Sequence, residues 1–192
     1  MNSAPKLIAT GLWKWLQGTG LERFEFLRAP DEWIFRGTIL TLADDVPAEA
    51  RYEITCDRLF QTRRANISLL DSSGEHSLKI EAQNGRWVEN GRENQSVKGA
   101  VDIDLGWSPS TNTLPIKRLK LDVGQSSSEF IAAWVRFPDL TLQPLPQEYF
   151  RLEDRKYRYS SRGGAFVANL RVDDEDLIVD YEGFWLRAKS NK

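Results

Sequence analysis

The segment Gly99–Val123 reads GAVDIDLGWSPSTNTLPIKRLKLDV. Near its start, apolar residues alternate with Asp102 and Asp104, which predicts a half-buried strand with both carboxylates on its polar face. Near its end, leucine and valine again alternate with charged residues, which predicts a second strand. If these two strands pair, the aspartates lie near Arg118 and Lys120 on one surface of a sheet.

The run between the two strands, Trp107–Pro115, is rich in serine, threonine, asparagine and proline. These residues hydrogen-bond nearby backbone groups or restrict the backbone, so we expect a structured loop. The polar side chains of the loop have two uses. They can satisfy the backbone of a rigid, buried turn, or they can bind the polar atoms of a ligand, and one use does not exclude the other.

The rest of the chain also favours strands. Apolar residues occupy alternate positions in Arg51–Cys56, Arg63–Leu70 and His76–Gln83. The pairs Asn84–Gly85 and Asn90–Gly91 are strong hairpin signals, because a type I′ turn needs positive φ at both central residues. No amphipathic helix of three or more turns is apparent, so we predict an all-β roll, barrel or sandwich.

Three segments are less regular. Ile8–Trp15 fits either a strand or a helical turn. Ala43–Ala50 contains two adjacent aspartates and a proline, which predicts a loop. Pro138, Pro144 and Pro146 argue against a helix or a central strand in their segment, because proline cannot donate a backbone hydrogen bond.

Length and charge exclude several classes of protein. A chain of 192 residues suits one domain, so we expect a single domain over residues 1–192. The net charge of -2, with no basic block, argues against a nucleic-acid surface. The sequence shows no secretory leader pattern and no apolar run long enough to span a bilayer. Cys56 is the single cysteine, so no internal disulfide can form, and we expect a cytoplasmic protein.

No established catalytic or metal-binding motif occurs. His76 is the only histidine and no calcium-loop spacing is present, so we expect neither a metal nor another cofactor. Asp102 and Asp104 could act as an acid/base pair, because two carboxylates on one strand face shift each other's pKa. We favour a structural ion-pair ladder with Arg118 and Lys120, since such networks place charges in the same way.

The run DIDLGWSPSTNTLPIKRL, residues 102–119, resembles the signature of a bacterial glycolipid-binding family. Ala133–Leu140, Leu145–Tyr149 and Tyr157–Ser160 fit the same pattern in the same order, and the resemblance covers nearly the whole chain. It implies a spiral β-roll, in which one long curved antiparallel sheet wraps on itself and encloses a groove with an apolar inner face. It also implies a glycolipid or another lipid as the ligand.

We therefore expect a non-catalytic protein that binds an amphipathic ligand in this groove. Amides and hydroxyls would hold polar atoms of a sugar or headgroup, while aromatic rings pack against an apolar face of the ligand. The residues expected to bind the ligand are Trp107, Asn112, Thr113, Arg118, Trp134, Gln147 and Tyr149.

Two other functions fit the sequence. The chain could be an enzyme that acts on a sugar or lipid derivative through Asp102, Asp104 and Tyr149, or a protein–protein adaptor without a small ligand. A sizeable apolar cavity would favour the carrier. A water-filled cleft with a raised carboxylate pKa would favour the enzyme. A filled interior with an exposed apolar patch would favour the adaptor.

Overall fold

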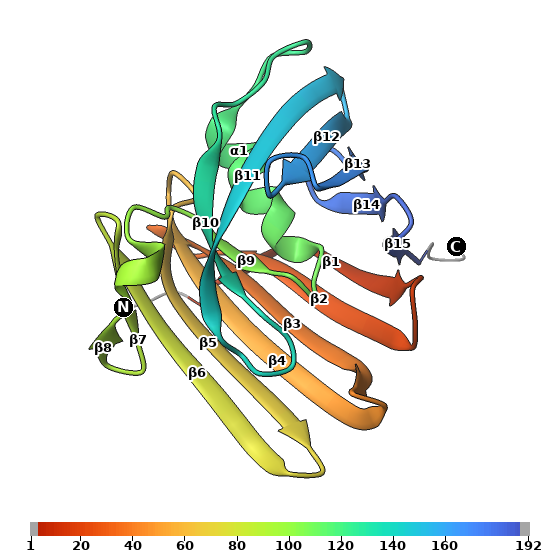
Figure 1. Ribbon diagram of the computed structural model, residues 1–192. Coiled ribbons are helices and arrows are strands. Elements are labelled where there is room, and N and C mark those ends of the chain that lie inside the picture. The colour runs from red at the N-terminus through yellow and green to blue at the C-terminus, as the bar shows by residue number, and fades with distance from the viewer. Residues whose placement is uncertain (1–3, 189–192) are drawn as a thin grey trace.

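The structure is a computed structural model that describes residues 4–188. Within these residues, all of the strands belong to one curved 15-stranded sheet, as Figure 1 shows. Helices are few and short. The predicted all-β class is confirmed, and none of the helices in the described part of the chain is long and apolar enough to cross a membrane.

The first half of the sheet is a meander in which each strand pairs antiparallel with the next. Ile8–Trp15, which fits either a strand or a helical turn by sequence, lies in the strand β1. The strands of this half are β1 (Lys6–Trp15), β2 (Gly20–Arg28), β3 (Glu32–Ala43), β4 (Val46–Asp57), β5 (Thr62–Asp71), β6 (Gly74–Gln83), β7 (Arg86–Glu89) and β8 (Arg92–Glu93).

The second half is a shorter meander that joins the first through the pairing of its last strand with β1. Its first strand pairs parallel with the next, and the others pair antiparallel. The strands are β9 (Ile103–Leu105), β10 (Phe130–Val135), β11 (Leu142–Glu153), β12 (Lys156–Ser161), β13 (Phe166–Val172), β14 (Ile178–Tyr181) and β15 (Trp185–Arg187). The single-turn 3₁₀ helix η1 (Gln95–Val97) lies in the connection between the halves.

The sheet order runs from β8 through β1 and β15 to β9, so β8 and β9 are its two edges. The β9 edge nevertheless contacts β5 of the first half. The Thr62 amide of β5 donates to the Val101 carbonyl at 3.2 Å, and the Ile103 amide donates to Thr62 Oγ1 at 3.0 Å. The sheet therefore wraps on itself without closing, which confirms the spiral β-roll.

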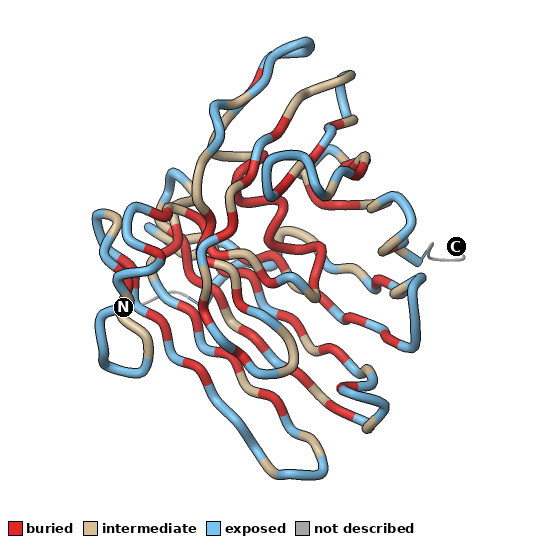
Figure 2. The backbone as a smooth tube through the Cα atoms, viewed as in Figure 1, coloured by how far each residue is buried: buried red, intermediate tan, exposed pale blue. Residues whose placement is uncertain are grey.

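The predicted inward faces are confirmed. Buried and exposed residues alternate along the strands in Figure 2. On β4, Tyr52, Ile54 and Cys56 are all buried, and β5 and β6 follow the same period. A continuous cluster of these side chains fills the inside of the roll in place of a long open groove.

Both asparagine–glycine turns are confirmed, because all four of their residues have positive φ. The predicted loop over Ala43–Ala50 is wrong. β3 runs to Ala43 and β4 begins at Val46, so only Asp44 and Asp45 form the turn, with φ of 47° and 64°. Aspartate tolerates the left-handed region, which allows these two residues to close a tight hairpin.

The exclusion of a central strand around Pro144 and Pro146 is also wrong, since both residues lie in β11, which is not an edge of the sheet. They pair with β10, whereas the pairing of β11 with β12 begins only at Gln147. The Pro146 carbonyl faces the β12 side, where it accepts from the Arg162 amide at 3.1 Å. The two prolines therefore lie in the part of β11 that has no neighbouring β12 residue. The N–H groups that proline lacks would have had no strand partner on that side.

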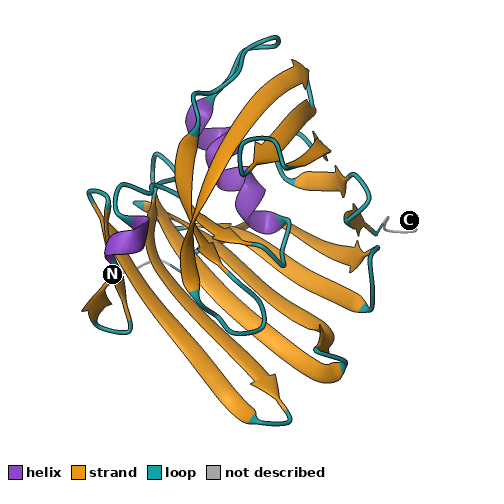
Figure 3. Cartoon of the chain, viewed as in Figure 1, coloured by secondary structure: helices purple, strands orange, loops and turns teal. Residues whose placement is uncertain are grey.

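The loop and strand predicted between residues 107 and 123 are wrong as well. This segment forms the single-turn 3₁₀ helix η2 (Ser110–Asn112) and the α-helix α1 (Thr113–Leu119), which ends at Lys120 in a left-handed conformation. Figure 3 shows these helices between the two halves of the sheet. A proline near the start of a helix is tolerated, because the N–H groups there have no intrahelical partner.

Candidate functional site

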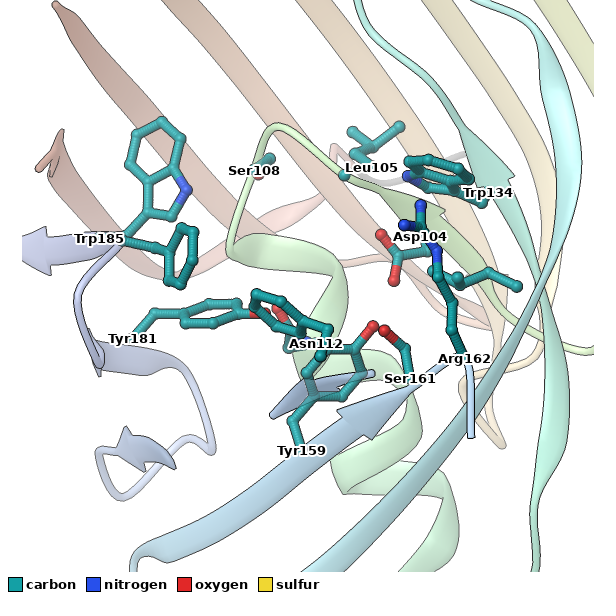
Figure 4. A pocket seen from close by; sticks show the side chains of 14 residues that line it. Asp104, Leu105, Ser108, Asn112, Trp134, Tyr159, Ser161, Arg162, Tyr181 and Trp185 are labelled. Atoms are coloured by element: carbon teal, nitrogen blue, oxygen red, sulfur yellow. The ribbon is translucent and has the colours of Figure 1, made fainter. Parts of the chain in front are cut away.

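A pocket of about 210 Å³ lies between the β9–η2 segment and the other strands of the second half, β10–β15. Figure 4 shows its lining side chains. The pocket has an aromatic wall formed by the rings of β12–β15, whereas Trp134 lies beside Asp104 and Arg162, which are the two charged residues. The aromatic residues are Trp134, Tyr159, Phe166, Tyr181, Phe184 and Trp185, and the neutral polar ones are Ser108, Asn112 and Ser161.

The aromatic wall is held by contacts between its own rings. The Phe184 ring lies 5.3 Å from Phe166 and 5.4 Å from Tyr181, edge to face in both cases. The Tyr159 ring lies 5.9 Å from Phe166 in the same manner. Edge-to-face pairs stabilise one another beyond simple burial, so these rings form a rigid surface for a ligand.

Asp104 is the acidic group of the pocket. It lies on β9 and is only partly exposed, and one of its carboxylate oxygens accepts a short hydrogen bond from the Gln147 amide. Burial, with a smaller contribution from the charge of Asp102, raises the pKa of Asp104 to about 6 despite the Gln147 bond. Within residues 4–188, no cation forms an ion pair with this carboxylate.

Asp102 has a different role from Asp104. Its carboxylate is 1% exposed and receives two hydrogen bonds from Arg118 Nε and one from Nη2, at 2.5–3.1 Å. Burial raises the pKa of Asp102, and the Arg118 bonds and charge oppose that rise. The prediction of an ion-pair ladder on the surface of the sheet is therefore wrong. The Asp102–Arg118 pair is buried, and Lys120 is exposed without an ion pair in the described chain.

Trp134 and Gly106 are neighbours in the lining of the pocket. A Cβ atom at position 106 would stand 2.2 Å from the indole Nε1. The guanidinium groups of Arg162 and Arg136 lie 5.0 and 5.7 Å from the indole ring. Two cations near the ring and the close approach of Gly106 restrict the orientation of the indole.

We expect Gly106→Ala to displace the Trp134 indole. The residue at 106 does not need positive φ, so the effect would come from the methyl group alone. The emission spectrum of the protein should change, while the far-ultraviolet circular dichroism keeps its strand signature. Gly11→Ala is the steric control, because Gly11 does not have positive φ and a Cβ atom there would approach only the Arg187 side chain, at 3.7 Å or more. Unchanged Trp134 emission in the Gly106→Ala protein would contradict this packing.

The predicted ligand residues are only partly brought together. Asn112 and Trp134 line the pocket. Gln147 and Tyr149 lie one hydrogen bond behind it, since Gln147 donates to Asp104 and the Tyr149 hydroxyl accepts from Asn112 Nδ2 at 2.9 Å. The other three predicted residues, Trp107, Thr113 and Arg118, do not line the pocket.

Each of these three residues has another contact. The Thr113 hydroxyl donates to the Asp176 carbonyl at 3.2 Å. Arg118 holds Asp102 and lies over Phe130. The Trp107 ring packs 5.6 Å from Phe137, and its buried Nε1 has no hydrogen-bond partner among the described residues.

A buried carboxyl that was not among the predicted site residues lies behind the pocket. Glu22 of β2 is 0% exposed. Its Oε1 accepts from the Tyr52 hydroxyl at 2.6 Å and from the Ser108 hydroxyl at 2.8 Å, and Ser108 lines the pocket. Ser110 completes a ring of hydrogen bonds through Tyr52 and Ser108. Glu22 Oε2 has no partner within the described chain.

Burial raises the pKa of Glu22 to about 8, although the Tyr52 and Ser108 hydrogen bonds favour the ionised form. Gly37 leaves the space that the Tyr52 ring occupies, because a Cβ atom at position 37 would lie 2.3 Å from that ring. The one signal in the sequence was the position of Glu22 on the apolar face that also carries Phe24 and Phe26. A charge at such a position indicates a specific partner.

Comparison with known proteins gives two matches. A family model described as "Putative glycolipid-binding" matches residues 10–187. The crystal structure of a DUF1089 family protein from Pseudomonas aeruginosa superposes with a TM-score of 0.80 at 30% identity, over 88% of this chain and 92% of that one. None of the curated proteins searched matches the chain.

Proposed function

Because the chain belongs to the glycolipid-binding family, we propose that it binds a glycolipid and holds the sugar headgroup in the pocket beside Asp104. The observation that carries this proposal is a carboxylate without a cation partner in the described chain, facing a wall of aromatic rings. Sugar hydroxyls would donate to the carboxylate, and the C–H face of the sugar ring would pack on the aromatic wall. Asn112 and Ser161 add neutral polar groups to the lining of the pocket.

The size of the pocket supports a headgroup site. Pockets for drug-sized ligands span about 300–1,000 Å³. The volume here, about 210 Å³, is smaller and suits one sugar ring better than an acyl chain. The core of the roll is filled by side chains, so the acyl chains would remain outside the pocket.

We expect Trp134→Ala to weaken the binding of a glycolipid or its headgroup by more than about 1 kcal/mol, as for the loss of an aromatic anchor. Saturable quenching of tryptophan emission by methyl glucoside, or by galactosyl diacylglycerol in vesicles, measures the affinity. Trp33→Ala is the matched control, because Trp33 is also partly buried but stacks on Phe60 away from the pocket. Equal weakening by both changes, or no saturable binding to the folded wild-type protein, would contradict the proposal.

The binding should depend on pH through Asp104. Its pKa of about 6 means that the carboxylate is ionised at pH 7.5 and largely protonated at pH 5. A protonated acid accepts hydrogen bonds less strongly, so affinity should fall between these two pH values. Calorimetric titrations should show a weaker and pH-independent affinity for Asp104→Asn. A wild-type affinity that rises on acidification would contradict this role.

The raised pKa of Asp104 is also the observation that favours an enzyme. The other members of that hypothesis are engaged elsewhere, since Asp102 is held by Arg118 and the Tyr149 hydroxyl by Asn112. Glycoside hydrolysis ordinarily uses two carboxyl groups that flank the bond. With one carboxylate lining the pocket, binding is the better supported function.

A further inference from the structure

The two charged groups of the pocket have no ion-pair partner in the described chain. Asp104 is held by the neutral amide of Gln147. Arg162 lies over the Trp134 indole at 5.0 Å, and within residues 4–188 no carboxylate lies within ion-pair distance of its guanidinium. The two charges therefore remain available, one for hydroxyl donors and one for an acceptor.

The position of Arg162 suits it to bind an anion. Its backbone amide is fixed to the Pro146 carbonyl at 3.1 Å, and its side chain extends toward Trp134 in Figure 4. A guanidinium stacked on an aromatic face keeps its N–H donors free in the plane of the group. Those donors match the two oxygens of a phosphate or carboxylate.

A second cation lies at the same ring. The Arg136 guanidinium is 5.7 Å from the Trp134 indole and likewise forms no ion pair with a described residue. Arg136 is exposed, and its amide is fixed to the Thr141 carbonyl at 2.9 Å. Arg136 does not line the pocket, so Arg162 is the cation that lies in the pocket together with Asp104, and Arg136 adds positive charge near the same indole.

Building on the proposed headgroup site, we infer that the headgroup is an anionic sugar, with a phosphate or carboxylate bound by Arg162 and ring hydroxyls bound by Asp104. The same chemistry occurs in a lipid headgroup and in a free sugar phosphate. The acidic group must project from the ring toward Arg162, because Arg162 is the one cation among the residues that line the pocket.

The test compares glucose 6-phosphate, methyl glucoside and inorganic phosphate by calorimetry with the wild-type protein, Arg162→Gln and Arg158→Gln. Arg158 is the matched control, an exposed arginine on β12 that does not line the pocket. We expect the wild-type protein and Arg158→Gln to bind glucose 6-phosphate at least about tenfold more tightly than methyl glucoside, the effect of one charge-assisted hydrogen bond. Arg162→Gln should lose this preference and still bind methyl glucoside.

Equal affinity of the wild-type protein for both sugars would overturn the inference and leave the proposed function standing. Inorganic phosphate that binds as tightly as glucose 6-phosphate would also overturn it. Absence of binding to any probe would overturn the inference together with the proposed function. Co-sedimentation with phosphatidylcholine vesicles, with and without phosphatidylinositol, distinguishes the sources, because a lipid ligand requires binding to the phosphatidylinositol vesicles.

Discussion

Replacement of Arg118 by methionine should lower the free energy of unfolding by about 3–5 kcal/mol, because it leaves a buried carboxylate without its cation. Asp102 is 1% exposed, and Arg118 supplies its only ion pair among the described residues. Methionine keeps most of the volume of the side chain and its contact with Phe130, so the loss reports the charge and not a cavity. Urea unfolding at pH 7 measures the change.

The control for this change is Lys120→Met, which removes an exposed cation two positions away and should change the free energy by less than about 0.5 kcal/mol. The double variant Asp102→Asn, Arg118→Met should recover much of the loss, since it buries no charge. Equal effects of Arg118→Met and Lys120→Met would show that Asp102 is solvated in solution and would contradict the buried pair.

The alternation of apolar residues was sufficient to predict most of the sheet. The period of two in β4, β5 and β6 identifies the inward face without any knowledge of the partners. The asparagine–glycine turns fix where two hairpins reverse. These signals are local, so a single chain reveals them.

The errors arose where tertiary context decides the structure. Pro144 and Pro146 are compatible with β11 only because β12 stops short of them. The residues from Ser110 to Leu119 form helices inside the roll, although their composition is typical of a turn. At these places the structure of a segment depends on the segments packed around it. The local sequence does not show which segments those will be.

The contacts of the candidate site are hard to predict from the sequence for the same reason. Asp102 and Arg118 were expected to lie close together because two predicted strands would pair, whereas Arg118 reaches Asp102 from helix α1. Glu22 meets Tyr52 across 30 residues and Ser108 across 86, and nothing local to any of them indicates the contact. Pocket walls made from distant strands follow from the curl of the sheet, which the sequence pattern does not specify.

The second large effect concerns Glu22 and the dependence of stability on pH. Its pKa is raised from 4.5 to about 8 in the folded protein, so between these values the folded state binds one more proton than the unfolded state. Stability contributed by this group is complete below pH 4.5 and is lost as pH rises through 8. The wild-type free energy of unfolding should therefore fall by on the order of 3–5 kcal/mol through this group between pH 5 and 9.

Glu22→Gln should remove this fall, because the amide is neutral at every pH and its carbonyl can accept from Tyr52 and Ser108. The range from pH 7 to 9 isolates the effect, since the pKa of Asp104, about 6, makes it lose its proton mainly below pH 7. Urea unfolding at several pH values should show Glu22→Gln to be more stable than the wild-type protein at pH 9. Glu75→Gln, a change at an exposed carboxyl, should follow the wild-type curve. Parallel curves for Glu22→Gln and the wild-type protein between pH 7 and 9 would mean that Glu22 is ionised throughout this range, and that the hydrogen-bond ring stabilises the carboxylate in spite of its burial.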